Sequence, residues 1–182
     1  MFRLVQGDVG CGKTIVAQIS MYANQLAGYQ SALLAPTEIL ARQHVKNMHK
    51  LGLEATLYVS SLAAKEKKEI LEKLENGEIF NVVGTHALFQ ENVVFHKLGL
   101  VIADEQQRFG VKQRRSLLEK GKCVDFLMMS ATPIPRTYAH FLYGDMDISS
   151  IHTMPIGRKS VVTKYFKTAS MAPCLNDVLN FV

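Results

Sequence analysis

Short apolar runs alternate with longer amphipathic stretches along most of the chain. The apolar runs are rich in Val, Ile, Leu and Phe, which is typical of strands buried on both faces. The stretches between them favour helices and often end at Gly or Asn, residues that commonly close helices. This alternation predicts an α/β fold of three layers, a parallel sheet with helices on both faces. The predicted strands are 2–6, 31–35, 56–59, 79–83, 98–103 and 124–129, and the predicted helices are 13–27, 37–50, 62–74, 111–119 and 135–143.

Polar residues mark where two of these helices should begin. Thr37 follows Pro36 and is a predicted N-cap, because its hydroxyl can accept a hydrogen bond from the first turn. Ser61 is the predicted N-cap of the helix over 62–74. That helix carries many Lys and Glu residues four positions apart, a pattern that indicates a solvent-facing surface.

The regular alternation loosens from Asp145 onward. The segment 155–159, Pro-Ile-Gly-Arg-Lys, is a predicted linker, because Pro and Gly interrupt helices and strands and two charged residues follow them. Residues 160–166 alternate as a strand, and 175–182 begin a helix. Because one strand and half a helix bury little core, we expect one domain over 1–155, then a linker and the truncated start of a second domain over 156–182.

Composition narrows the class of protein without assigning a function. At 48% hydrophobic and 20% charged residues the chain resembles ordinary soluble globular proteins. Its apolar runs are shorter than the roughly 20 residues that span a bilayer, and the N-terminus lacks the order of a signal peptide, so we expect a cytoplasmic protein. The three widely spaced cysteines argue against a disulfide framework and a zinc site. A net charge of +5 permits a polyanionic partner but equally fits a solvated surface.

The clearest chemistry follows the first predicted strand. Residues 7–14 read GDVGCGKT and fit the phosphate-loop pattern G-x-x-x-x-G-K-[ST] between a strand and a helix. Loop glycines let backbone N–H groups turn toward phosphate oxygens, and the helix N-terminus adds positive potential. The Lys can reach the outer phosphates, and the Thr hydroxyl can ligate Mg²⁺. The predicted nucleotide-binding residues are Gly7, Asp8, Val9, Gly10, Cys11, Gly12, Lys13 and Thr14.

A second acidic element follows the apolar run that ends at Ala103. Asp104 stands at the carboxyl end of this predicted strand, where a carboxylate can hold Mg²⁺ beside a phosphate loop. Glu105 is of the type that accepts a proton from an attacking water. Adjacent carboxylates alone are common in loops. Their place, downstream of a phosphate loop within alternating strands and helices, favours the catalytic interpretation.

Five strings together resemble a known family. They are GDVGCGKT, APTEILA (35–41), VGTHAL (83–88), DEQQRFG (104–110) and SATPIPRT (130–137). They resemble motifs I, Ia, Ib, II and III of superfamily 2 helicases, and more closely those of the RecG-type family of ATP-dependent DNA helicases, over essentially the whole chain. DNA translocases of the transcription-repair coupling type share several of these strings and are the nearest alternative. Glu38 and Gln106 favour the RecG type.

The resemblance implies a RecA-like ATPase lobe and a role for each motif. Lys13 and Thr14 would bind phosphates and Mg²⁺, Asp104 would hold Mg²⁺, and Glu105 would activate water. The implied coupling residues, between nucleotide state and DNA, are Gln107, Ser130 and Thr132. The implied DNA-binding residues are Pro36, Thr37, Glu38, Gly84, Thr85 and His86, where helices are expected to begin and free N–H groups can meet backbone phosphates. Gln107 departs from the family, which commonly has His there, so a coupling role that needs an imidazole is in doubt.

The resemblance also implies cofactors and partners. ATP and Mg²⁺ would be the cofactors, and branched DNA, meaning forks and Holliday junctions, would be the substrate. A second RecA-like lobe with an arginine finger and an N-terminal wedge domain would act in cis, so we expect the 182-residue chain alone to be a nearly inactive monomer in the bacterial cytosol. Two other interpretations stay open: a non-motor phosphate-loop switch or kinase, and a degenerate structural lobe. The extra motif matches weigh against the first, and the intact Lys13, Thr14, Asp104 and Glu105 weigh against the second.

Cys11 lies inside the phosphate loop, immediately before the predicted helix. A thiol near a helix N-terminus and a lysine often reacts readily, so we expect alkylating reagents to modify Cys11 and bound nucleotide to protect it. A small residue at a variable loop position is the simpler account of why it is there.

Overall fold

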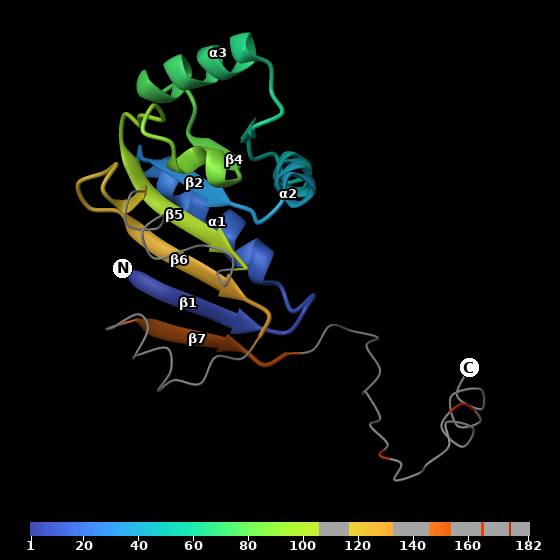
Figure 1. The fold of residues 1–182 in the computed structure, drawn as a ribbon. Coiled ribbons are helices and arrows are strands. Elements are labelled where there is room, and N and C mark those ends of the chain that lie inside the picture. The colour runs from blue at the N-terminus through green and yellow to red at the C-terminus, as the bar shows by residue number, and fades with distance from the viewer. Residues whose placement is uncertain (106–116, 133–145, 154–164, 166–174, 176–182) are drawn as a thin grey trace.

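The computed structural model describes residues 1–105, 117–132, 146–153, 165 and 175. This part of the chain forms a seven-stranded sheet of order β3-β4-β2-β5-β6-β1-β7, in which all neighbouring strands pair in parallel (Figure 1). The strands are β1 (Phe2–Gly7), β2 (Gln30–Leu34), β3 (Thr56–Tyr58), β4 (Asn81–Gly84), β5 (Leu98–Asp104), β6 (Asp125–Ser130) and β7 (Asp147–Ile151). The helices are α1 (Lys13–Leu26), α2 (Glu38–Lys50), α3 (Ala64–Glu75) and the short 3-10 helix η1 (His86–Phe89). The predicted three-layer α/β fold is confirmed.

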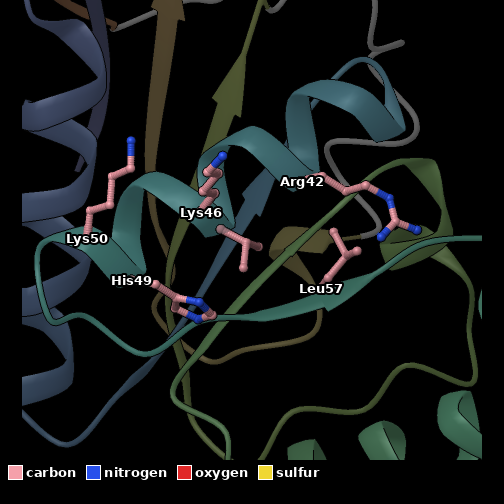
Figure 2. Close-up of a pocket in the computed structure, with 6 residues that line it drawn as sticks. Arg42, Lys46, His49, Lys50 and Leu57 are labelled. Carbon is pink, nitrogen blue, oxygen red and sulfur yellow. The ribbon is translucent and has the colours of Figure 1, made fainter.

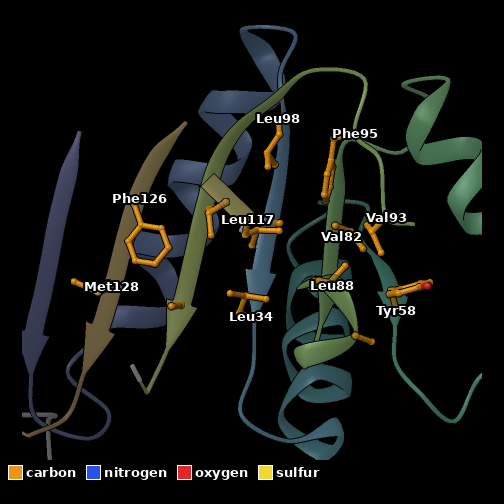
Figure 3. Close-up of a cluster of buried hydrophobic side chains, with 14 of the residues drawn as sticks. Leu34, Tyr58, Val82, Leu88, Val93, Phe95, Leu98, Leu117, Phe126 and Met128 are labelled. Carbon is orange, nitrogen blue, oxygen red and sulfur yellow. The ribbon is translucent and has the colours of Figure 1, made fainter. Parts of the chain in front are cut away.

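Two hydrophobic clusters hold the layers together, one on each face of the sheet. Neighbouring residues of a strand point to opposite faces, so Leu33 packs under α1 and α2 while Leu34 belongs to the other cluster. Ala17, Met21, Ala41 and Met48 are the fully buried residues that the two helices contribute to the first cluster. Figure 3 shows the second cluster, which includes Leu34, Tyr58, Val82, Leu88, Leu98, Leu117, Phe126 and Met128.

The start of α3 differs from the prediction. Ser61 does not cap the helix: its hydroxyl donates to the Glu38 carboxylate at 2.7 Å. The helix begins at Ala64, and the Glu66 carboxylate accepts a hydrogen bond from the Ala63 N–H at 3.2 Å. The predicted cap was wrong because a serine near a helix start has other acceptors within reach, and here a charged one.

The sheet also gains a strand where the sequence pattern loosens. Residues 147–151 form β7, which pairs with β1 in register from Arg3↔Asp147 to Gly7↔Ile151. Arg3 secures the pairing, because its guanidinium donates to the Asp147 carboxylate at 2.9 Å and to the Ser149 hydroxyl at 2.8 Å. The helix predicted over 111–119 lies mostly outside the described residues. The helix over 135–143, the linker at 155–159 and the elements predicted after it also lie outside them, apart from the single positions 165 and 175.

A buried glutamine fastens the opposite, amino edge of the sheet. Gln30 is 2% exposed, and its amide nitrogen donates to the carbonyls of Leu74 at 2.9 Å and Ile79 at 2.7 Å. Its amide oxygen accepts from the Lys97 N–H at 2.9 Å. One side chain thus contacts three backbone groups and links β2 to the end of α3 and the entry of β5. The Leu74 carbonyl also accepts from the Gly77 and His96 N–H groups, whereas Gln30 is the partner of the Ile79 carbonyl and the Lys97 N–H among the described residues. Among the described residues, no helix combines the length and apolarity needed to cross a membrane.

Candidate functional site

The predicted motifs converge on the carboxyl edge of the sheet. Because all strands are parallel, their carboxyl ends meet at one edge, where α/β proteins commonly bind ligands. Residue pairing across neighbouring strands places the motifs in a row: Gln6 opposite Ser130, Met129 opposite Asp104, and Ala103 opposite Leu34, which also pairs with Gly84. Segments that are far apart in the sequence therefore meet along one line of the fold (Figure 1).

The phosphate loop has the backbone shape that its glycines allow. Gly10 and Gly12 have φ angles of 81° and 101°, a region that other residues adopt at a cost. Gly12 is also the N-cap of α1, so the loop leads directly into the helix N-terminus. A Cβ on Gly7 would lie 2.5 Å from the Cys11 sulfur, so the loop closes tightly on itself at this residue.

Donor groups of this loop fit a phosphate ligand. Within the described part of the chain, no group accepts a hydrogen bond from the backbone N–H of Gly10, Gly12, Lys13 or Thr14. The Lys13 ammonium donates to the carbonyls of Gly7 at 2.7 Å and Asp8 at 2.8 Å. A groove of about 460 Å³ opens beside the loop and is lined by Gly10, Gly12, Lys13, Thr14, Ile15, Gln18, Asn47, Lys50 and Leu51. Free amides at a helix N-terminus, with lysines beside them, are the donor set that phosphate oxygens need.

Asp104 ends β5 and makes an unpredicted contact. Its Oδ2 lies 2.8 Å from Nε2 of His44 on α2, and the side chains of His44 and Asp104 are 7% and 19% exposed. Carboxylate and hydroxyl oxygens are ligands that Mg²⁺ prefers, and Asp104 with Thr14 offers one of each. Glu105 follows with a φ of 50°, a left-handed conformation that costs a non-glycine residue about 1–2 kcal/mol. Such strain is typical of functional sites.

Sequence reasoning missed His44, although the pattern held a signal for it. The buried face of α2 consists of Ala41, His44 and Met48, so a polar side chain stands in the middle of an apolar stripe. A buried imidazole needs a hydrogen-bonding partner, and the nearest predicted site offers a carboxylate. The spacing places His44 on the inner face, but only the fold brings Asp104, 60 positions further along the chain, next to it.

The implied coupling residues lie beside this pair, as far as they are described. Ser130 is buried at the end of β6, and its hydroxyl lies 3.1 Å from the Thr132 hydroxyl. The Ser130 hydroxyl also accepts from the Thr132 N–H at 3.2 Å. The two residues therefore form a local turn at the sheet edge, which agrees with a capping role and does not test a coupling role. Gln107 lies outside the described residues.

The two implied DNA-contacting segments lie next to each other. The Ala35 N–H donates to the Gly84 carbonyl at 2.8 Å, which joins the segment from Pro36 to the segment from Gly84. Thr37 caps α2 as predicted, since its hydroxyl accepts from the Leu40 N–H at 3.3 Å. The side chains differ in access: Thr37 and His86 are exposed, Pro36 and Glu38 half-buried, and Gly84 and Thr85 buried.

Glu38 is already engaged inside the protein. Its carboxylate accepts from the Ser61 hydroxyl at 2.7 Å and from Arg42 Nη2 at 2.7 Å. The hydrogen bond from Ser61 and then the one from Arg42 hold the pKa of Glu38 below its ordinary value, because both stabilise the charged form. This carboxylate therefore ties the start of α2 to the connection that leads into α3.

A phosphate loop between a parallel strand and a helix, with a carboxylate at the end of a neighbouring strand, defines a P-loop NTPase of the RecA-like kind. The chain belongs to the DEAD/DEAH box helicase family, whose model matches residues 3–141. This membership favours the motor interpretation over a phosphate-loop switch or kinase.

Relatives make the resemblance more specific. The chain is 54% identical over 170 residues to the ATP-dependent DNA helicase RecG of Staphylococcus aureus strain NCTC 8325, and 55% identical over 169 residues to that of Streptococcus pneumoniae TIGR4. Each match covers 92% of this chain and 25% of the relative, so the chain spans about a quarter of the curated relatives. The predicted similarity to the RecG type is confirmed.

Solved structures agree on the fold. A structure of RecG bound to a three-way DNA junction matches with a TM-score of 0.76 and 44% identity, over 98% of this chain and 24% of that chain. The helicase domain of Hef from Pyrococcus furiosus matches with a TM-score of 0.62 over 82% of this chain and 35% of that one. Its 17% identity supports the fold alone.

Proposed function

We propose that this chain is the ATP-binding motor lobe of an ATP-dependent DNA helicase or translocase. The substrate would be branched DNA, such as forks and Holliday junctions, in repair and recombination in the bacterial cytosol. The observation that carries the proposal is the loop of free amides and Lys13 at the same sheet edge as Asp104. The similarity to RecG over 92% of the chain supports the choice of DNA motor over other users of ATP.

Each residue of the site then has a defined task. The loop amides and Lys13 would hold the phosphates of ATP, while Thr14 and Asp104 would hold Mg²⁺. The bound metal supplies positive charge that stabilises the phosphates during hydrolysis. Glu105 carries the carboxylate that would accept a proton from the attacking water. Ser130 and Thr132, at the end of β6, would transmit the state of this site to the DNA-contacting segments, and Gln107 would take part with them.

DNA would run along the outer part of the same edge. Thr37 and His86 are exposed there, and Thr37 opens α2, so backbone amides and polar side chains can meet phosphates without reading bases. The resemblance implies that an arginine finger comes from a second lobe in cis, with a wedge domain that recognises the branch. Because such a finger is worth roughly 10³–10⁵ in rate, we expect slow turnover from these 182 residues alone.

A titration with a fluorescent nucleotide in the presence of Mg²⁺ tests the proposal. We expect saturable binding in the wild type, loss of binding in Lys13→Ala, and no change in Lys65→Ala, which removes an exposed lysine of α3 far from the loop in sequence. A second series adds a fork-shaped DNA and a linear duplex of the same length. Equal nucleotide binding by the wild type and Lys13→Ala would refute the site, and failure to bind either DNA would refute the DNA-contacting edge. A preference for the fork is expected only with the wedge domain present in cis.

A further inference from the structure

Helix α2 connects the implied DNA-contacting segment with the proposed metal site. Its first turn carries Thr37 and Glu38, which stand in the implied DNA-contacting segment. Two turns later His44 turns inward and contacts the Asp104 carboxylate at 2.8 Å. His44 is buried between Ala41 and Met48 on the helix face that packs on the sheet, so neither its ring nor the helix can move without disturbing the core.

We propose that His44 is a positioning residue for the metal site. By engaging Oδ2 of Asp104, it fixes the orientation of the carboxylate and leaves Oδ1 for Mg²⁺. Groups that orient a metal ligand in this way typically change metal affinity or activity 10–100-fold when removed. The contact also gives α2 a direct connection from the DNA-contacting segment to the metal ligand. This inference rests on the proposed function, because it assumes that Asp104 serves a metal bound with nucleotide.

A purely structural role for His44 makes a different prediction. If the pair only satisfied a buried imidazole, removing the ring would weaken the fold and reduce every ligand affinity alike. A positioning role affects only the affinity that depends on the metal. Nucleotide affinity measured with Mg²⁺ and with a chelator therefore distinguishes the two roles. A structural role lowers both affinities alike, whereas a positioning role lowers only the affinity with Mg²⁺.

The experiment compares dissociation constants of a fluorescent ADP, with Mg²⁺ and with EDTA. We expect His44→Ala to weaken binding about 10-fold with Mg²⁺ and to leave binding in EDTA unchanged. His44→Gln keeps an N–H donor near the position of Nε2 and should recover most of the loss. His96→Ala is the control, because His96 is exposed and precedes β5, at the opposite end of that strand from Asp104.

Each result decides the question. An unchanged Mg²⁺-dependent affinity in His44→Ala, or an equal loss with and without Mg²⁺, would overturn the positioning role. Equal binding by Lys13→Ala and wild type would instead refute the proposed nucleotide site. A readout without nucleotide then still tests the contact: the ring NMR signals of His44 should shift in Asp104→Asn, and unchanged signals would overturn the proposal.

The outer face of α2 presents a second feature. A groove of about 540 Å³ runs between this helix and β3 and is lined by Arg42, Val45, Lys46, His49, Lys50 and Leu57 (Figure 2). The four polar residues among them are all basic or titratable to a cation, and no acidic side chain lines the groove. Arg42 forms an ion pair with Glu38, whereas Lys46 has no ion pair among the described residues.

We infer that this groove binds the sugar–phosphate backbone of DNA and extends the DNA-contacting segment along α2. The groove is on the same helix that Thr37 opens, and Arg42 to Lys50 spans about 12 Å at 1.5 Å per residue. Basic side chains supply the positive charge that attracts phosphates, and Val45 and Leu57 form an apolar surface against which the sugars can pack. The absence of acidic lining favours a polyanion of uniform charge over a folded protein surface of mixed charge.

The test measures DNA affinity at several salt concentrations for the full chain. We expect Lys46→Glu to weaken binding several-fold and to reduce the slope of log affinity against log salt by about one, because one phosphate contact is lost. Lys65→Glu changes the net charge equally on α3 and should leave the slope unchanged. Equal effects of the two variants would refute the groove as a contact, while absent DNA binding by the wild type would refute the proposed function itself.

Discussion

Gly84→Ala tests how closely β4 packs against β3 and η1. Gly84 pairs with Tyr58 of β3, and a Cβ built on it would lie 2.3 Å from the Tyr58 carbonyl oxygen and 3.0 Å from two carbons of Leu88. The oxygen belongs to the backbone of a neighbouring strand, so it cannot rotate away as a flexible side chain could. The site can accept alanine only if β3 and β4 separate or η1 shifts.

The magnitude follows from this geometry. Overpacking a close-packed interior costs typically 1–3 kcal/mol, and a backbone obstacle places Gly84→Ala toward the upper end, at about 2–3 kcal/mol. For a domain of this size each kcal/mol lowers the melting temperature by roughly 2–4 °C, so we expect a fall of about 4–12 °C. Figure 3 shows Tyr58 and Leu88 in the cluster that would have to adjust.

Thermal unfolding followed by circular dichroism, with urea titration as a second measure, tests this prediction. Gly28→Ala is the control: its φ of 80° strains an alanine by about 1 kcal/mol, but nothing lies within 4 Å of the added Cβ. If Gly84→Ala costs no more than Gly28→Ala, the close approach of β3 to β4 is not rigid, and the reasoning fails.

Three further outcomes are expected. Gln30→Ala should destabilise the fold by about 2 kcal/mol in urea titration, because it leaves the Ile79 carbonyl and the Lys97 N–H without a partner, whereas the exposed Gln43→Ala should change little. Alkylation of Cys11, whose sulfur lies 3.9 Å from the Lys13 ammonium, should slow when Mg-ATP is added; equal rates would contradict nucleotide protection. The pKa of Glu38 is lower in the fold than its ordinary value, so its stabilising effect is complete above that value and is lost as the pH falls through the lowered pKa. Stability should therefore fall on acidification and fall less in Glu38→Gln, and parallel pH profiles would count against the contact with Ser61.

Much of the fold was predictable because the hydrophobic pattern along the sequence marks where the buried strands lie. A buried parallel strand such as β5 reads as a continuous apolar run, and the parallel arrangement then places Asp104 at the edge of the phosphate loop. The phosphate loop itself is local, since its shape depends on glycines that are neighbours in sequence. What depends on one continuous segment could be read from the sequence.

Contacts between distant segments could not be read in the same way. Ser61 has the residue type of a cap, and only the packing of α2 against the following loop offers it Glu38 instead. β7 is short and polar on one side, and its pairing depends on Arg3 reaching it from β1. The contact of His44 with Asp104 needs both the inner face of α2 and the end of β5. Each of these features follows from tertiary geometry that overrides or completes a local preference.

The pairing of β7 with β1 has a mechanical consequence. Gln6 pairs with Ser150 and Gly7 with Ile151, so the last strand of the sheet ends directly alongside the first residue of the phosphate loop. A small pocket at this point is lined by Gly7 and Asp8 on one side and by Ser150 to Thr153 on the other. The residues from the end of β7 to Thr153 thus lie beside the phosphate loop. Because β7 pairs with the strand that leads into the loop, a displacement of β7 would reach Gly7 through one ladder of backbone hydrogen bonds.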